Sequence, residues 1–263
     1  MGQDKLRAQA QRAAVVATCF FFATAWLLTG AGAAEAPCPA AVPSLTRAGT
    51  LDELTGHVQA RTPVRIVAIG SSSTEGVGAS SKDKSYPALL EVELKAAWKL
   101  DGVRVENAGI GGETAVQTVE RLEAVIASKP DLVIWQVGTN DAVRGGDETE
   151  FRALVTRGVT AARKAAVDIV LLDQQFFPGI KDLEQYRRYV RIVREVGREN
   201  GVSVFSRFAL MRAWGEQSAE ELRSMLASDA FHMSDRGYAC MTQSLGRALS
   251  SLVPAVPSMA AAY

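Results

Sequence analysis

Three consecutive serines follow a short, β-branched segment of the chain. The segment Val64–Ile69 leads into Gly70, and Ser71, Ser72 and Ser73 come directly after it. A serine on a tight turn between a strand and a helix exposes its hydroxyl at the edge of a sheet, where the oxygen can attack a carbonyl carbon. Serine-rich turns also cap helices, so this run alone leaves both interpretations open.

A serine nucleophile needs a base, and the sequence contains two histidines. His57 precedes the first of these strand-like segments and has no other chemically suited residues around it. His232 closes the segment Asp229–His232, in which a carboxylate lies three residues before the imidazole. In a turn such a carboxylate reaches the ring, fixes its tautomer and stabilises the imidazolium. We therefore favour His232 as the base, over the alternative of a loop histidine that caps a helix.

Two further loops contain potential hydrogen-bond donors. Gly111 and Gly112 follow the predicted strand Val103–Asn107, and Asn140 follows the predicted strand Leu132–Val137. Acyl transfer places negative charge on an oxygen, which preorganised N–H groups stabilise. Each of these residues is ordinary in a turn by itself. Together with the serines they predict a site for attack on a carbonyl group.

Strands and helices alternate along the chain. Short apolar segments predict strands at 64–69, 103–107, 132–137, 169–172 and 202–205, and apolar residues at helical spacing predict helices at 86–99, 114–128, 148–166, 183–199 and 234–252. This order predicts right-handed crossovers and one doubly wound α/β domain, with a five-stranded parallel sheet and helices on both faces. Ligands bind beyond the carboxyl ends of the strands in such sheets, which is where the serines, glycines and asparagine fall.

Four motifs, in this order, resemble those of the SGNH (GDSL-type) hydrolases. They are Gly70–Thr74, Asn107–Thr114, Gly138–Asp141 and Asp229–His232, and the match extends from Ile66 to the last predicted helix. The resemblance implies a flavodoxin-like sheet and an esterase or lipase-like acyl hydrolase without a metal or organic cofactor.

The same resemblance implies a role for each site residue. It makes Ser72 the nucleophile, completes a triad with Asp229 and His232, and forms an oxyanion hole from Ser72, Gly112 and Asn140. One position departs from the family pattern, since Ser71 stands where the first motif usually has Asp. That Asp is not a triad member, so we expect the mechanism to be kept. The replacement is expected to affect the loop geometry or the substrate preference instead.

Composition and spacing argue against several other functions. Basic and acidic residues number 29 each, which gives no electrostatic reason to expect nucleic acid as a partner. No Walker or G-x-G-x-x-G motif is present, and the histidines and cysteines lack the spacing of metal ligands. We therefore expect no cofactor and no metal, and a small-molecule or glycan ester as the partner. Aromatic residues of the later loops, Phe176, Phe177, Trp214 and Phe231, are expected near the cleft.

The first 36 residues have the order of a secretory signal peptide. Three basic residues precede an uncharged, mostly apolar run at 13–29, and Ala34–Ala36 offers an A-x-A cleavage site. We expect residues 1–36 to be removed. The run is only just short of a membrane span, so an uncleaved anchor is the alternative, and membrane association is expected only in that case. A cleaved signal peptide and an uncleaved anchor each place the rest of the chain outside the cytoplasm, so we expect a periplasmic or secreted protein.

The rest of the chain divides into a lead-in at 37–62, a hydrolase domain at 63–254 and a tail at 255–263. Cys38 and Cys240 remain after cleavage, and an even pair in an oxidising compartment predicts a disulfide. Two free thiols are the alternative.

These observations predict an exported serine esterase that hydrolyses carboxylic esters of small acyl or acetyl groups. An O-acetyltransferase that modifies an envelope glycan with the same triad is one alternative. A non-catalytic glycan-binding module is another, although the full set of five site residues argues against it.

Overall fold

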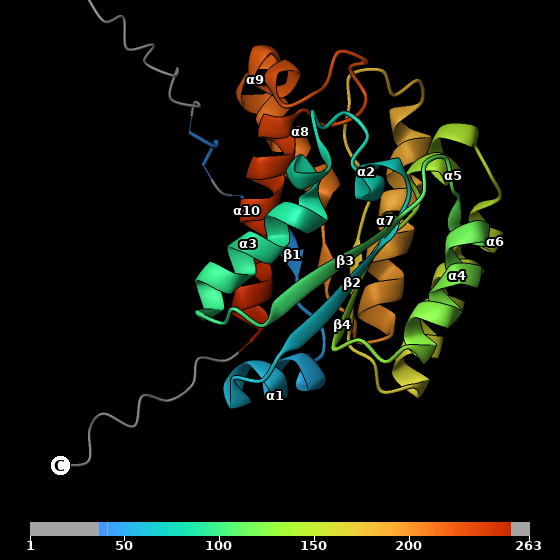
Figure 1. Ribbon diagram of the computed structural model, residues 1–263. Coiled ribbons are helices and arrows are strands. Elements are labelled where there is room, and N and C mark those ends of the chain that lie inside the picture. The colour runs from blue at the N-terminus through green and yellow to red at the C-terminus, as the bar shows by residue number, and fades with distance from the viewer. Residues whose placement is uncertain (1–36, 41, 254–263) are drawn as a thin grey trace, which may run out of the picture. The chain divides into compact units, whose positions relative to one another are not determined.

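The structure is a computed structural model that describes residues 37–40 and 42–253 (Figure 1). The predicted signal peptide and the predicted C-terminal tail lie outside the described residues. No helix in the described part of the chain combines the length and the apolar character needed to cross a membrane.

A six-stranded sheet forms the centre of the fold. Its strands are β1 (Leu45–Thr46), β2 (Val64–Gly70), β3 (Val103–Gly109), β4 (Leu132–Gln136), β5 (Ile169–Leu172) and β6 (Val204–Phe205), in the order β1-β6-β5-β4-β2-β3. Five strands are parallel, and β1 pairs antiparallel with β6. The doubly wound α/β class is confirmed, but the prediction of five strands was one too few. A strand of two residues has no periodicity that a sequence pattern can reveal.

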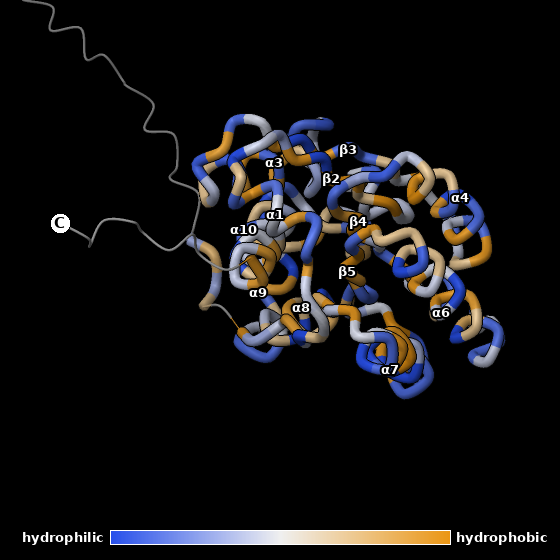
Figure 2. The backbone as a smooth tube through the Cα atoms, turned by 90° about the horizontal axis from the view of Figure 1, so that it is seen from below, coloured by the Kyte–Doolittle hydropathy of each residue, from blue (hydrophilic) through white to orange (hydrophobic). Residues whose placement is uncertain are grey.

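Helices cover both faces of the sheet. They are α1 (Asp52–Ala60), α2 (Ser72–Glu75), the 3₁₀ helix η1 (Lys82–Lys84), α3 (Tyr86–Trp98), α4 (Ala115–Ala127), α5 (Thr139–Arg144), α6 (Glu148–Lys164), α7 (Leu183–Glu199), α8 (Arg207–Gln217), α9 (Ala219–Ser224) and α10 (Asp235–Leu252). Figure 2 shows α3 and α10 on one side of the strands and α4, α6 and α7 on the other. The five long helices predicted from apolar spacing are confirmed to within two residues at each end.

The apolar sequence of the central strands follows from their burial on both faces of the sheet. Every residue of β4 is buried, and the large side chain of Trp135 is 0% exposed. Gln136 ends this strand as its one polar residue and is 1% exposed. A buried amide must find hydrogen-bond partners, and Gln136 finds them in the turn that follows β2.

The edge strand β3 is protected by helix α3. Glu91 of α3 accepts a hydrogen bond from the backbone N–H of Val105 at 2.9 Å, and its other oxygen lies 2.6 Å from the Lys95 ammonium. Charged side chains that occupy the free N–H groups of an edge strand keep it from pairing with another chain. A groove beside this edge remains open.

A disulfide joins the two ends of the described chain. Cys38 and Cys240 are bonded, with their Cα atoms 5.4 Å apart and a sequence separation of 202 residues. The bond ties the segment before β1 to the middle of α10. The segment 37–62, expected as a surface lead-in, thus contributes a strand, a helix and a cross-link to the fold.

Candidate active site

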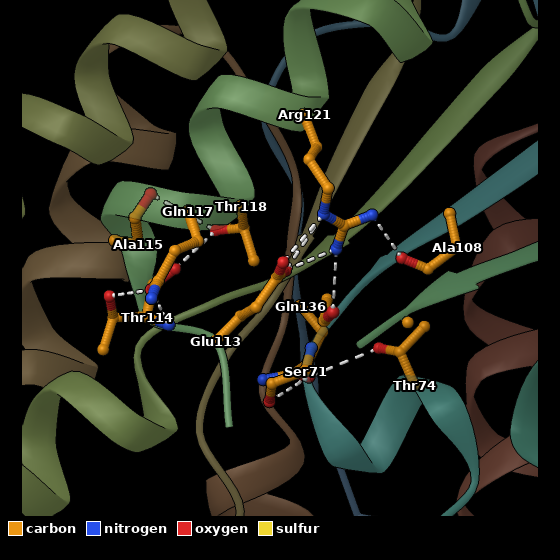
Figure 3. A network of polar contacts seen from close by, with 12 residues as sticks. Ser71, Thr74, Ala108, Glu113, Thr114, Ala115, Gln117, Thr118, Arg121 and Gln136 are labelled. Carbon is orange, nitrogen blue, oxygen red and sulfur yellow. Dashed lines mark hydrogen bonds and ion pairs between the residues drawn. The ribbon is translucent and has the colours of Figure 1, made fainter. Parts of the chain in front are cut away.

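The turn after β2 is built by one buried amide. The Oε1 of Gln136 accepts hydrogen bonds from the backbone N–H of Ser71 at 2.9 Å, from the Ser71 hydroxyl at 3.1 Å and from the Thr74 hydroxyl at 3.3 Å (Figure 3). Because Ser71 and Thr74 are both buried, these bonds fix the path of the chain from the strand into α2. Ser72 is the first residue of that helix.

The three adjacent serines have different environments. Ser71 points inward to Gln136, and Ser73, which is 2% exposed, donates its hydroxyl to Gln175 Oε1 at 2.7 Å. The Ser72 hydroxyl lies 2.9 Å from Nε2 of His232. Ser72 is therefore the one serine of the three whose oxygen contacts the imidazole.

Asp229 holds the other side of that imidazole. Its Oδ2 lies 2.6 Å from His232 Nδ1, and its Oδ1 accepts the backbone N–H groups of Phe231 at 3.0 Å and His232 at 2.9 Å. Partial burial acts to raise the pKa of Asp229, but the hydrogen bonds from the imidazole and the two N–H groups outweigh it, and the pKa is lowered. An ionised carboxylate at Nδ1 leaves Nε2 free to accept the proton of Ser72.

The loop after β3 is held by side chains of α5. Asn140 Nδ2 donates to the carbonyl oxygen of Glu113 at 2.7 Å, and Arg144 Nη2 donates to that of Gly112 at 2.9 Å. Gly112 has a φ of +80°, a conformation in which a side chain is strained. Two consecutive carbonyl groups are thus fixed beside the amide that the sequence assigned to the oxyanion hole.

A partly buried ion pair ties the same loop to the strands. Arg121 Nε donates to both carboxylate oxygens of Glu113 at 2.9 and 3.1 Å, and Nη1 donates to the carbonyl of Ala108 at 2.9 Å (Figure 3). Its Nη2 also approaches the carbonyl of Gly70 at 3.4 Å. A single guanidinium from α4 therefore connects the ends of β2 and β3 to the loop.

Asp141 orients α4 itself. Both of its carboxylate oxygens accept the backbone N–H of Ala115, at 3.0 and 3.1 Å. Burial raises the pKa of this carboxyl, against the opposing effect of the N–H donors. A side chain of α5 thus satisfies the first turn of α4, which follows the oxyanion loop.

An aromatic pocket of about 340 Å³ lies next to Phe231, the residue that precedes His232. It is lined by Ala142, Val143, Arg144, Gly145, Phe177, Gly179, Ile180, Lys181, Asp182, Gln185, Tyr186 and Phe231. The Phe231 ring packs edge-on against both Phe177 and the His232 imidazole, with centroids 4.7 Å apart in each case. Phe177 and Phe231 lie near the site as predicted, whereas Trp214 is 1% exposed and belongs to the core.

The structure joins Ser72, His232 and Asp229 in one hydrogen-bonded chain, ties Asn140 to the loop that contains Gly112, and leaves His57 apart. The His57 imidazole contacts Thr62 at 2.8 Å and lies 3.3 Å from Asp131, a residue that precedes β4 at the opposite end of the strands. No group of three or more His, Cys, Asp or Glu side chains suited to a metal ion occurs in the described part of the chain.

Sequence reasoning missed the supporting residues Gln136, Gln175, Glu113, Arg121 and Arg144. The position of Gln136 in the sequence could have indicated its role, since a polar residue at the end of a strand buried on both faces must be hydrogen-bonded. The pair formed by Glu113 and Arg121 joins a loop residue to helix α4, so it depends on the path of the loop rather than on the periodicity of one element.

A parallel sheet with a Ser–His–Asp hydrogen-bonded chain beyond its carboxyl edge is typical of serine hydrolases. The chain belongs to the non-GDSL lipase-like family, whose model matches residues 37–254. The family name agrees with the first motif, in which Ser71 replaces the usual Asp.

Individual relatives carry esterase names. The chain is 30% identical to esterase TesA of Pseudomonas aeruginosa over 47% of its own length and 61% of that protein. It is 27% identical to an acetylxylan esterase of Geobacillus stearothermophilus over 68% of its own length and 87% of that protein. The match thus spans about three fifths of the first relative.

Solved structures show the same fold. A lipase/acylhydrolase from Enterococcus faecalis superposes with a TM-score of 0.63 at 22% identity, covering 73% of this chain and 97% of that one.

Proposed function

We propose that this protein is an exported serine esterase that hydrolyses carboxylic esters of small acyl groups, acetyl among them, through an acyl-enzyme at Ser72. The observation that carries the proposal is the hydrogen-bonded chain from Asp229 through His232 to Ser72, with distances of 2.6 and 2.9 Å. Such a chain converts a hydroxyl into a nucleophile near neutral pH. Export, to the periplasm or beyond, rests on the predicted signal peptide.

Acylation begins when His232 Nε2 takes the proton of Ser72 as the serine oxygen attacks the ester carbonyl. The resulting oxyanion is stabilised by the backbone N–H groups of Ser72 and Gly112 and by the side-chain amide of Asn140. The protonated imidazole, stabilised by Asp229, then gives its proton to the leaving alcohol as the ester C–O bond breaks.

Deacylation repeats these steps with water in place of the serine. His232 takes a proton from a water molecule, which attacks the acyl-enzyme, and the proton returns to Ser72 as the acid leaves. The donors of the oxyanion hole serve both steps, so their loss slows both.

The relatives support an ester substrate. Esterase TesA and the acetylxylan esterase are both esterases by name. The aromatic pocket supports binding of the apolar acyl part, because Phe231, which lines the pocket, packs edge-on against the imidazole of the base.

The test compares two serines of the same turn. Ser72→Ala is expected to abolish hydrolysis of p-nitrophenyl acetate, whereas Ser73→Ala, which removes a buried hydrogen bond to Gln175, keeps turnover in its folded fraction. An organophosphonate is expected to label the peptide at Ser72. Full activity of Ser72→Ala, or a label on Ser73, contradicts the assignment.

A further inference from the structure

A polar groove of about 500 Å³ runs along the free edge of the sheet. It is lined by Glu75, Lys82, Ser85, Ala88, Glu91, Val105, Asn107 and Gly109. Ser72 follows β2, which lies between β4 and β3. The aromatic pocket is lined by residues of the segments after β4 and β5, whereas the groove is lined by residues of β3, α3 and the end of α2, so the two openings lie against different strands of the sheet.

The groove begins next to the nucleophile. A Cβ placed on Gly111 would lie 2.8 Å from Glu75 Oε2 and 3.9 Å from Ser72 Cβ, so both side chains border the same point. Asn107 Nδ2 donates to the backbone carbonyl of Glu75 at 3.3 Å, and Asn107 Oδ1 accepts the N–H of Gly109 at 2.9 Å. These bonds connect the end of α2 to β3 and set the position of Glu75 over the groove.

Two charged groups of the groove have no protein partner. Among the described residues, neither the Glu75 carboxylate nor the Lys82 ammonium is in a hydrogen bond or an ion pair, and both side chains are exposed. Glu91, by contrast, is engaged by Lys95 and by the N–H of Val105. The groove therefore offers one free acceptor and one free donor of opposite charge, above apolar atoms of Ala88 and Val105.

We propose that this groove binds the alcohol part of the ester, and that this part is a neutral sugar chain. Sugar hydroxyls both donate and accept hydrogen bonds, which suits Glu75 and Lys82 together, and the C–H faces of the rings suit Val105. The opposite charges of the two side chains favour a neutral ligand over a strongly charged one. The inference rests on the proposed esterase function, because it places the sugar oxygen that leaves from the acyl carbon beside Ser72.

The test measures selectivity between two acetyl esters. O-acetylated xylo-oligosaccharides present a sugar alcohol to the groove, and p-nitrophenyl acetate does not. Glu75→Ala and Lys82→Ala are each expected to lower kcat/KM for the oligosaccharides about tenfold relative to kcat/KM for p-nitrophenyl acetate, mostly through KM, because a hydrogen bond to a charged group is lost. Glu120→Ala, at an exposed carboxylate of α4, is the matched control and is expected to change neither value.

The outcomes separate the two proposals. If the wild-type enzyme cleaves no ester, the proposed function fails and the groove assignment fails with it. If it cleaves p-nitrophenyl acetate but not the acetylated oligosaccharides, or if the variants lower both activities equally, the esterase function stands and the groove assignment is wrong. A selective rise in KM for the oligosaccharides alone supports it.

Discussion

Asn140 has two amide N–H groups and therefore two tasks. One N–H holds the carbonyl of Glu113 at 2.7 Å, and the proposal gives the other to the oxyanion. Asn140→Ala is expected to lower kcat for p-nitrophenyl acetate on the order of 10²–10³, since it removes a donor that acts on charge formed in the transition state. Steady-state kinetics measure the effect, and a change confined to KM would contradict it. Asn200→Ala, at the end of α7, is the control.

Arg144 is predicted to be a positioning residue for the same oxyanion hole. A Cβ on Gly112 would meet only the Arg144 guanidinium, at 3.8 Å, and Arg144 donates to the Gly112 carbonyl itself, whereas Asn140 and Arg121 hold the neighbouring Glu113. Arg144→Ala is expected to lower kcat about tenfold, the value of one hydrogen bond, with little change in KM. Arg144→Lys is expected to recover part of the loss. A purely structural role would instead lower the melting temperature and leave kcat of the folded enzyme unchanged.

The residues of the proposed triad were predictable for chemical reasons. A scarcity of histidines favoured His232, which has Asp229 three residues before it in a segment after the last predicted strand, and the serine motif followed a strand. The sequence did not reveal which serine faces the base, except through the resemblance. That choice depends on Gln136 at the end of β4 and on Gln175 in the loop after β5, which turn Ser71 and Ser73 inward from positions distant in sequence.

Asp168 acts on the start of helix α1. Its Oδ2 accepts the backbone N–H of Leu54 at 3.0 Å. Burial, together with the nearby carboxylates of Asp52 and Glu53, raises the pKa of Asp168 to about 6, although the N–H donor opposes this. The unfolded chain releases this proton near pH 4, at about the ordinary value. The free energy of unfolding therefore falls as the pH rises from about 4 to about 6.

Asp168→Asn is expected to remove this pH dependence while keeping an oxygen that accepts the Leu54 N–H. The variant should be more stable than the wild type by about 1 kcal/mol above pH 6, a modest value because water screens a partly exposed carboxylate. The difference should vanish near pH 4. Urea unfolding at a series of pH values measures it, with Asp101→Asn as an exposed control. A gain of equal size at every pH would contradict the titration of Asp168.

Element length separated the helices that were predicted from those that were not. The long helices α6 and α7 each have 17 residues, enough for apolar spacing to show which face is buried. Helices α2 and α5 have four and six residues, too few to be stable alone. Long-range partners hold them in place: Gln136 binds the turn before α2, and Asp141 links α5 to α4. Such contacts have no local sequence pattern.

The whole molecule is closed by the bond between Cys38 and Cys240. The two residues are 202 positions apart, so the cross-link restricts almost the entire described chain in its unfolded state. The chain-entropy relation gives about 5 kcal/mol for a loop of this length, and measured losses of native disulfides are typically about 2–5 kcal/mol. The bond is therefore expected to matter for stability far more than for the chemistry at Ser72.

Reduction of the native protein, or the double variant Cys38→Ala/Cys240→Ala, is expected to lower the free energy of unfolding by about 2–5 kcal/mol. Urea unfolding with and without reductant measures the loss, and the double variant should not respond to reductant. Turnover of the folded enzyme should persist, because the segment between His232 and α10 keeps its own bonds, from Ser80 to Asp235 at 2.7 Å and from Ser234 to Met225 at 3.0 Å. If reduction abolishes turnover without unfolding the protein, α10 must position His232 through the disulfide, and the separation of stability from catalysis is wrong.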